Sequence, residues 1–330
     1  MFDRRRPGSG PADQDTISMR SKTPTPDPTP RIARFRGDRR AALSLTFDDG
    51  FRAEVRDALE ILDPLGLKGT FFLIPHAMAP ENPDHEKFIT FEQARELIRN
   101  GHEVGTHGQT KYKLHEADDA TLDEQINGGW QLLADRTGVP PRSYAAPGGS
   151  NARDPRVQAK VFERHLFLRL NALGYGNTVQ RRWSDRKTRA RLKEAAKAGE
   201  WLTACIHSIV GGYSPFASKA AFRVHCEWLR AQDEWLWVAP MGEVGRYERM
   251  RDAARVEILS TQPRAVRFRV VCDLEPRAVF DRPLTAVVSA PAARAASATD
   301  SDGRGLRFSI RDGEIRVEAP ADGRPVTVAW

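Results

Sequence analysis

The chain has 330 residues, 40% of them hydrophobic and 29% charged, so it can bury a substantial core and is too long for one small module. Its longest apolar runs, at 41–47 and 69–74, are far shorter than the ~20 residues that a membrane-spanning helix needs. Three widely spaced cysteines give no sign of a disulfide framework or of a cysteine-rich zinc site. We therefore expect a globular protein without a membrane span.

The formal net charge of +7 is concentrated near the N-terminus, where residues 1–40 hold ten basic and five acidic side chains. Residues 1–39 are also rich in proline, serine and threonine, a composition that predicts a disordered, basic tail. The rest of the chain is nearly neutral, which argues against a nucleic-acid partner. The tail has no apolar segment of the kind found in signal peptides, so the cytoplasm is the default expectation.

From residue 41 onward, short apolar runs alternate with segments of helical periodicity. We expect strands at 41–48, 69–74, 103–107, 143–146, 177–180, 201–207 and 235–239. Helical patterns lie between them, at 51–65, 91–99, 121–137, 156–173, 188–198 and 217–231. About seven βα repeats predict an α/β fold, a distorted (β/α) barrel over residues 40–252. No glycine-rich phosphate-binding loop follows the first strand.

The pattern changes near residue 251, after which β-type segments follow one another without helices. They lie at 256–260, 265–271, 284–290, 306–310, 314–319 and 326–330. These segments predict a small, sandwich-like all-β domain over residues 253–330. Packing, oligomerisation or glycan binding are open roles for it.

Polar residues close several of the predicted barrel strands, and in a parallel barrel those ends form one mouth. The first strand ends in Asp48 and Asp49, the third at His107 and the sixth at His207. An Asp-Asp-Gly after a strand is also common as a helix cap. Together, however, two carboxylates and two imidazoles at one mouth favour metal-assisted hydrolysis.

Three sequence runs carry a resemblance to a known family: Thr-Phe-Asp-Asp-Gly at 46–50, Gly-His-Glu-Val-Gly-Thr-His at 101–107 and Trp-Leu-Thr-Ala-Cys-Ile-His at 201–207. They resemble the polysaccharide deacetylases (NodB homology, carbohydrate esterase family 4), over roughly residues 40–250. The resemblance implies a metal-dependent hydrolase that removes N-acetyl or O-acetyl groups from a polysaccharide or amino-sugar glycan. The family usually works outside the cytoplasm, which is at odds with the absent signal peptide.

The resemblance also implies roles for individual residues. Asp48 would be the general base and His207 the general acid, and Asp49 and His107 would bind the metal, with zinc as the first choice. The turn that follows the fourth strand would bind substrate and supply a backbone N–H to the developing oxyanion. The residues implied there are Tyr144, Pro147, Gly148 and Gly149.

The chain departs from the family pattern at the third metal ligand. The family motif is His-x-x-x-His, but the second histidine position is Lys111, and a protonated lysine has no lone pair for a metal. Its ammonium group would instead sit beside Asp49. Ala145 stands where an arginine commonly orients the catalytic aspartate, and Gly148 where a tyrosine is usual.

Three outcomes are open. A metal binds through Asp49, His107 and a substitute such as His115, His76 or water; the chain is a metal-independent amide hydrolase of the same superfamily; or it is a degenerate relative that binds glycan without turnover. We expect Cys205 to be a buried structural thiol rather than a ligand. Trp228, Trp235 and Trp237 are expected to pack helices onto the barrel rather than to bind sugar.

Overall fold

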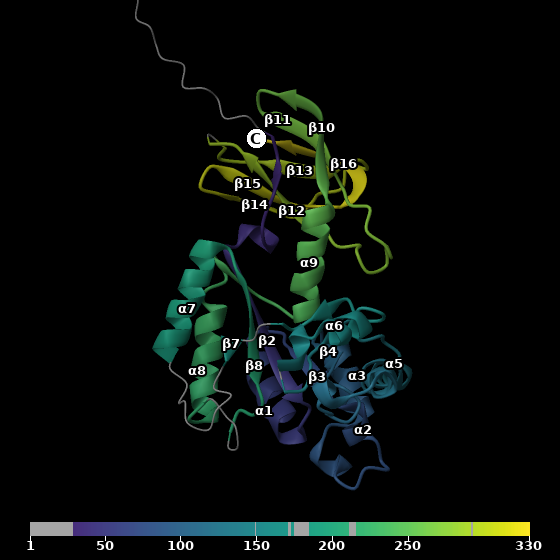
Figure 1. The fold of residues 1–330 in the computed structure, drawn as a ribbon. Coiled ribbons are helices and arrows are strands. Elements are labelled where there is room, and N and C mark those ends of the chain that lie inside the picture. Colours follow the sequence, from purple (N-terminus) through teal and green to yellow (C-terminus); the bar gives the residue numbers. More distant parts are fainter. Residues whose placement is uncertain (1–28, 149, 171–172, 175–184, 211–215, 292) are drawn as a thin grey trace, which may run out of the picture.

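The structure is a computed structural model that describes residues 29–148, 150–170, 173–174, 185–210, 216–291 and 293–330, which form a parallel α/β domain and an all-β domain (Figure 1). Strand β2 (Ala41–Asp49) runs through the first domain, and all nine of its residues are buried. In spatial order the described sheet runs β6 (Phe167–Leu168), β5 (Ser143–Tyr144), β4 (Glu103–Thr106), β3 (Thr70–Leu73), β2, β8 (Trp201–Ile206) and β7 (Leu173–Gly174), with β9 (Leu236–Val238) paired to the start of β2.

All strand pairs of this sheet are parallel. In the described part of the chain, β6 and β7 are the edge strands, each paired on one side only. The prediction of a distorted (β/α) barrel is confirmed. The helices are α1 (Arg52–Leu62), α2 (Pro75–Met78), α3 (Phe91–Arg99), α4 (Asp119–Asp123), α5 (Gly129–Thr137), α6 (Pro155–Val161), α7 (Asp185–Ala198), α8 (Lys219–Arg230) and α9 (Met241–Ala253).

The helix predicted over 156–173 is wrong beyond its first turns. Helix α6 ends at Val161, and the chain then forms β6 and β7, which have two residues each. A two-residue strand is too short to show the alternation by which strands are recognised. The strand predicted at 177–180 lies outside the described residues.

The second domain contains two four-stranded antiparallel sheets, as the sequence of β-type segments predicts. One has the order β1 (Arg31–Ile32), β12 (Leu284–Ser289), β15 (Glu314–Ala319) and β14 (Phe308–Arg311). The other has the order β10 (Arg255–Gln262), β11 (Ala265–Val271), β16 (Asp322–Ala329) and β13 (Ser297–Asp300).

The end of the predicted tail is folded, which corrects the expectation for residues 30–39. Arg31 and Ile32 form β1, which pairs with β12 at Val287 and Ala286. The side chain of Phe35 is fully buried in the core of the second domain. Residues 1–28 lie outside the described residues.

The all-β domain packs against the end of the barrel at which β2 begins. One apolar cluster joins Ala42 and Trp237, at the starts of β2 and β9, to Leu284 and Val317 of the β-sheets (Figure 1). The opposite end of β2, where Asp48 and Asp49 lie, therefore faces away from this domain. No described helix is long and apolar enough to cross a membrane.

The packing role expected for the tryptophans is confirmed. Trp228 and Trp235 lie against the barrel core and meet edge to face, with ring centroids 6.4 Å apart. Trp237 is buried and meets Tyr247 edge to face at 5.4 Å.

Candidate active site

The polar residues predicted at the strand ends do converge at one mouth. Asp48 and Asp49 end β2, His107 follows β4 and His207 follows β8. Nε2 of His207 lies 3.7 Å from Oδ2 of Asp48. Nε2 of His107 lies 4.0 Å from the same oxygen and 3.6 Å from Oδ1 of Asp49. All four side chains therefore belong to one site.

A strained turn places both neighbouring aspartates in this site. On a regular strand, successive side chains point to opposite faces. Asp49, however, has a φ of 79°, in the left-handed region that a non-glycine residue rarely adopts, and Gly50 follows with a φ of 82°. A Cβ at Gly50 would lie 2.7 Å from Cδ2 of Leu73, so only glycine fits there.

The sequence did not reveal Arg169, which is the strongest partner of Asp48. Its Nη1 and Nη2 donate to Oδ1 and Oδ2 of Asp48, both at 2.6 Å, and Nη1 also donates to Oγ1 of Thr46 at 2.7 Å. The guanidinium lies over the Phe72 ring, 5.0 Å from its centroid. Ala145 leaves no arginine at the position implied by the family pattern, and Arg169 brings the guanidinium from the end of β6 instead.

The electrostatic environment keeps Asp48 ionised. Burial is the largest single influence and would raise the pKa of its carboxyl, but the charge and hydrogen bonds of Arg169, together with His107 and His207, outweigh it. The pKa of Asp48 is therefore well below its usual range.

His107 is held as a neutral imidazole in one tautomer. Its Nδ1 donates to the backbone oxygen of Ala145 at 2.7 Å, which leaves the lone pair on Nε2 facing the carboxylates. Burial lowers the pKa of His107, although the two aspartates act in the opposite direction. Among the described residues, Oδ1 of Asp49 is buried without a hydrogen-bond donor. Two acceptors, Nε2 of His107 and Oδ1 of Asp49, thus face each other.

Lys111 lies where the sequence places it, beside Asp49. Its Nζ donates to Oδ2 of Asp49 at 2.7 Å, and its backbone also has a positive φ, of 61°. The Lys111 side chain is 44% exposed, whereas that of Asp49 is 5% exposed. The ammonium therefore approaches a buried carboxylate from the solvent side.

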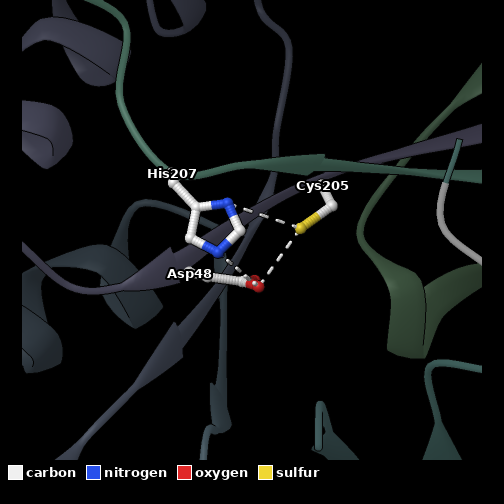
Figure 2. A group of neighbouring side chains, drawn as sticks. All are labelled: Asp48, Cys205 and His207. Carbon is white, nitrogen blue, oxygen red and sulfur yellow. Dashed lines mark hydrogen bonds and ion pairs between the residues drawn. The ribbon is translucent and has the colours of Figure 1, made fainter. Parts of the chain in front are cut away.

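Cys205 is buried, as expected, but its thiol belongs to the site (Figure 2). Sγ donates to Oδ2 of Asp48 at 3.2 Å and lies 3.8 Å from Nδ1 of His207. These three residues are close enough to be considered as metal ligands. However, the two oxygens of Asp48 already accept from Arg169, so a metal there would have to displace a guanidinium from a buried carboxylate.

The structure divides the residues implied for substrate binding. Tyr144 is fully buried and meets His165 edge to face at 5.1 Å, so its side chain lies in the core and its role in substrate binding stays a prediction. Pro147 packs close to the backbone of the mouth near Gly108, and Gly148 is exposed with a φ of 74°. Gly149 lies outside the described residues.

The two histidines considered as substitute ligands both lie on the surface. His115 is exposed and forms an ion pair with Glu116 at 3.3 Å, and the His76 side chain on α2 is exposed. In contrast, one buried acid near the site has no role in the family pattern. Both carboxyl oxygens of Glu54 on α1 lack a partner among the described residues, and burial, followed by the charges of Asp48 and Asp49, raises its pKa.

Comparison with known proteins supports the family resemblance. A family model described as polysaccharide deacetylase matches residues 36–164. A gellan lyase of Bacillus sp. is 24% identical over 335 residues, an alignment that includes 90% of this chain but 13% of that protein. The chain thus spans only a small part of that relative.

Solved structures share the fold. A putative polysaccharide deacetylase from Mycobacterium smegmatis superposes with a TM-score of 0.55 and 19% identity, over 67% of this chain and 94% of that one. A probable polysaccharide deacetylase from Pseudomonas aeruginosa PAO1 gives 0.52 and 15% over 66% and 93%. PuuE allantoinase also superposes with a TM-score of 0.52 and 15% identity, over 66% of this chain and 93% of that one. The expected resemblance to polysaccharide deacetylases is confirmed over residues 36–164, and the solved structures show the same barrel fold.

Proposed function

We propose, starting from the polysaccharide deacetylase match of residues 36–164, that this chain hydrolyses N-acetyl or O-acetyl groups on an amino sugar of a glycan. The observation that carries this proposal is the buried, ionised Asp48 beside the solvent-reaching His207, at the carboxyl ends of the barrel strands. A carboxylate and an imidazole so placed supply the base and the acid that amide hydrolysis requires.

Asp48 and His207 carry out the two proton transfers of the proposed hydrolysis. Asp48 accepts a proton from the attacking water, whose oxygen bonds to the acetyl carbon. For an N-acetyl group, the carbon–nitrogen bond then breaks as the protonated His207 donates its proton to the leaving nitrogen, which gives a free amine and acetic acid. The acid ionises to acetate, and the proton on Asp48 returns to His207 through solvent. The His207 side chain is 26% exposed, so it can reach a bound sugar and exchange its proton with solvent.

Pro147 and Gly148 border the proposed substrate site. Because glycine has no side chain, the exposed backbone at Gly148 can approach an acetyl group closely. A backbone N–H there would stabilise the oxyanion, as the family resemblance implies.

The residues fit part of a metal site. Oδ1 of Asp49 and Nε2 of His107 are the two atoms that would hold a divalent cation, because they face each other at 3.6 Å and Oδ1 has no donor. The backbone oxygen of Ala145 fixes the required histidine tautomer. Zinc, when bound, would supply Lewis-acid activation of water. Lys111 replaces the third protein ligand, so we expect weak binding completed by water.

The test is acetate release from N-acetylglucosamine oligomers. The expected result is turnover by the wild-type protein and a loss of about 10²–10⁴-fold in Asp48→Asn, because that variant lacks the base. Asp119→Asn is the matched control, since Asp119 is exposed and pairs with Arg156 on the surface. Equal rates for Asp48→Asn and the wild type would refute the proposed role of Asp48.

A second candidate, glycan binding without turnover, is favoured by the Lys111–Asp49 ion pair, which places a fixed ammonium beside a metal ligand. If the wild type binds no zinc and releases no acetate, whereas Lys111→His does both, the chain is a non-catalytic relative. Wild-type activity that survives complete removal of metal would instead identify a metal-independent amide hydrolase.

A further inference from the structure

A cavity of about 530 Å³ lies between the two domains, far from the candidate active site. It is bordered by α9 of the barrel and by the segments that precede β12 and β14. Trp237 also lines it, and the strand of this residue pairs with the start of β2, at the opposite end from Asp48. Its volume is within the range of roughly 300–1,000 Å³ typical of small-molecule sites. The charged residues on its wall are Arg36, Arg246, Arg282, Arg307, Glu243 and Glu318.

Positive charge exceeds negative charge on this wall. Arg36 forms ion pairs with both acids of the wall, at 3.3 Å to Glu243 and 3.1 Å to Glu318. In the described part of the chain neither glutamate forms an ion pair with the other three guanidinium groups, although the charge of Glu243 attracts Arg246. Arg282 is 3.6 Å from Asp281, outside the cavity wall, and its side chain is 64% exposed. The cavity wall therefore carries more positive than negative charge.

Arg246, on α9, is the most informative of the three. Its Nε is buried and has no hydrogen-bond partner among the described residues. Burial lowers the pKa of its guanidinium, and the like charges of Arg282 and Arg142 lower it further, whereas Glu243 and Asp281 act more weakly in the opposite direction. Such an arrangement is unfavourable in the free protein, and an anion in the cavity would relieve it.

We propose that the junction cavity binds a carboxylate-bearing sugar, a uronic acid unit of an acidic polysaccharide. Guanidinium groups match the planar geometry of a carboxylate. The oxygens of Glu243 and Glu318 can accept hydrogen bonds from sugar hydroxyls, and they oppose a small, multiply charged anion such as phosphate. The choice of a sugar rests on the proposed function, whereas the need for an anion rests on the cavity alone.

The test is calorimetric titration of the full chain with a galacturonic acid trimer, an N-acetylglucosamine trimer and inorganic phosphate. We expect the acidic trimer to bind, with affinity that falls as salt is added, and the neutral trimer to bind at least tenfold more weakly at this site. Binding should be retained in Asp48→Asn, so failure of this inference is distinguishable from failure of the proposed hydrolysis.

Arg246→Gln should weaken binding of the acidic trimer at least tenfold, and Arg282→Gln, which changes an exposed side chain, several-fold. Arg99→Gln is the control, because Arg99 is an exposed arginine on α3 that pairs with Glu92. Unchanged affinity in both cavity variants overturns the proposal, as does the absence of binding to the wild type. Displacement of the acidic trimer by equimolar phosphate would identify a general anion site and overturn the assignment to a sugar.

Discussion

The two ends of the barrel differ in how completely their buried charged groups are paired. At the mouth, Asp48 is paired with Arg169 and Asp49 with Lys111, at 2.6 and 2.7 Å. At the other end, Nε of Arg246 is buried without a partner among the described residues, and the repulsion of Arg282 and Arg142 exceeds the attraction of Glu243 and Asp281. Paired charges fix the positions of side chains that must align with a reacting bond. A guanidinium that its neighbours compensate only in part instead retains its capacity to bind a ligand, at some cost to the stability of the free protein.

The largest expected effect comes from breaking the buried pair at the mouth. Arg169→Met should lower the free energy of unfolding by about 3–5 kcal/mol, because it leaves the buried carboxylate of Asp48 without its main partner. Urea titration monitored by circular dichroism would measure this loss.

The matched control is Arg164→Met, which removes an exposed arginine that lies over the Trp130 ring, and it should cost under about 1 kcal/mol. The double variant Asp48→Asn/Arg169→Met should recover much of the lost stability, because neither charge is then left alone. Similar losses in Arg169→Met and Arg164→Met would show that the mouth does not depend on this pair.

The next largest effect concerns a buried titratable group beneath the mouth. Burial lowers the pKa of His165 to about 4, and its Nδ1 has no partner among the described residues. Below pH 6.5 the unfolded chain takes up a proton that the folded ring does not accept until about pH 4. Stability should therefore fall as pH drops through this window, by roughly 3 kcal/mol from this residue, and level off below it.

His165→Gln isolates that contribution. The difference in unfolding free energy between the wild type and this variant should change between pH 7 and pH 4.5, and urea titrations at both values would measure it. A difference independent of pH would show that the mouth end accommodates an unpaired charge as readily as the junction does.

Lys111→His replaces the ammonium group beside Asp49 with a side chain that can bind a metal, and so tests the role of the paired charges at the mouth. We expect the affinity for zinc to rise about 10–100-fold, because a third protein ligand completes the set begun by Asp49 and His107. Competition with a fluorescent chelator would measure it. Lys111→Met is the control, since it removes the ammonium without adding a ligand; equal zinc affinity in the two variants would contradict a ligand role for position 111.

The smallest expected effect is at the junction. Arg246→Gln should raise the free energy of unfolding by roughly 0.5–1 kcal/mol in the absence of ligand, because it relieves repulsion from Arg282 and Arg142. Differential scanning calorimetry would detect the change. A clear loss of stability would mean that Arg246 is a structural residue, and the contrast between the two ends would fail.

Sequence reasoning succeeded where pattern and function coincide. The run 46–50 combines a buried parallel strand with a glycine that the turn requires, so it could be predicted both as structure and as a site. His107 and His207 followed from the rule that parallel strands end at a common edge. Within the motif 101–107, His102 and Glu103 instead serve the fold: His102 accepts from the backbone N–H of Gly69, and Glu103 accepts from Thr70 and Ser143.

The failures have physical causes. Arg169 was missed because it follows a strand of two residues, which carries no periodicity, and because its partner Asp48 is 121 residues away along the chain. Residues 30–39 were assigned to a tail from their composition, but tertiary contacts with β12 and β15 order them. Local sequence contains neither signal, because both depend on partners that only the completed fold provides.

Strand β1 has a consequence for the order in which the molecule is made. Arg31 and Ile32 leave the ribosome about 250 residues before their partners in β12. Until β12 has been synthesised, β1 has no strand to pair with. The barrel can fold before then, because its βα units are local in sequence. The later of the two domains thus captures one of the earliest described segments, and this pairing ties the two domains together once β12 has been made.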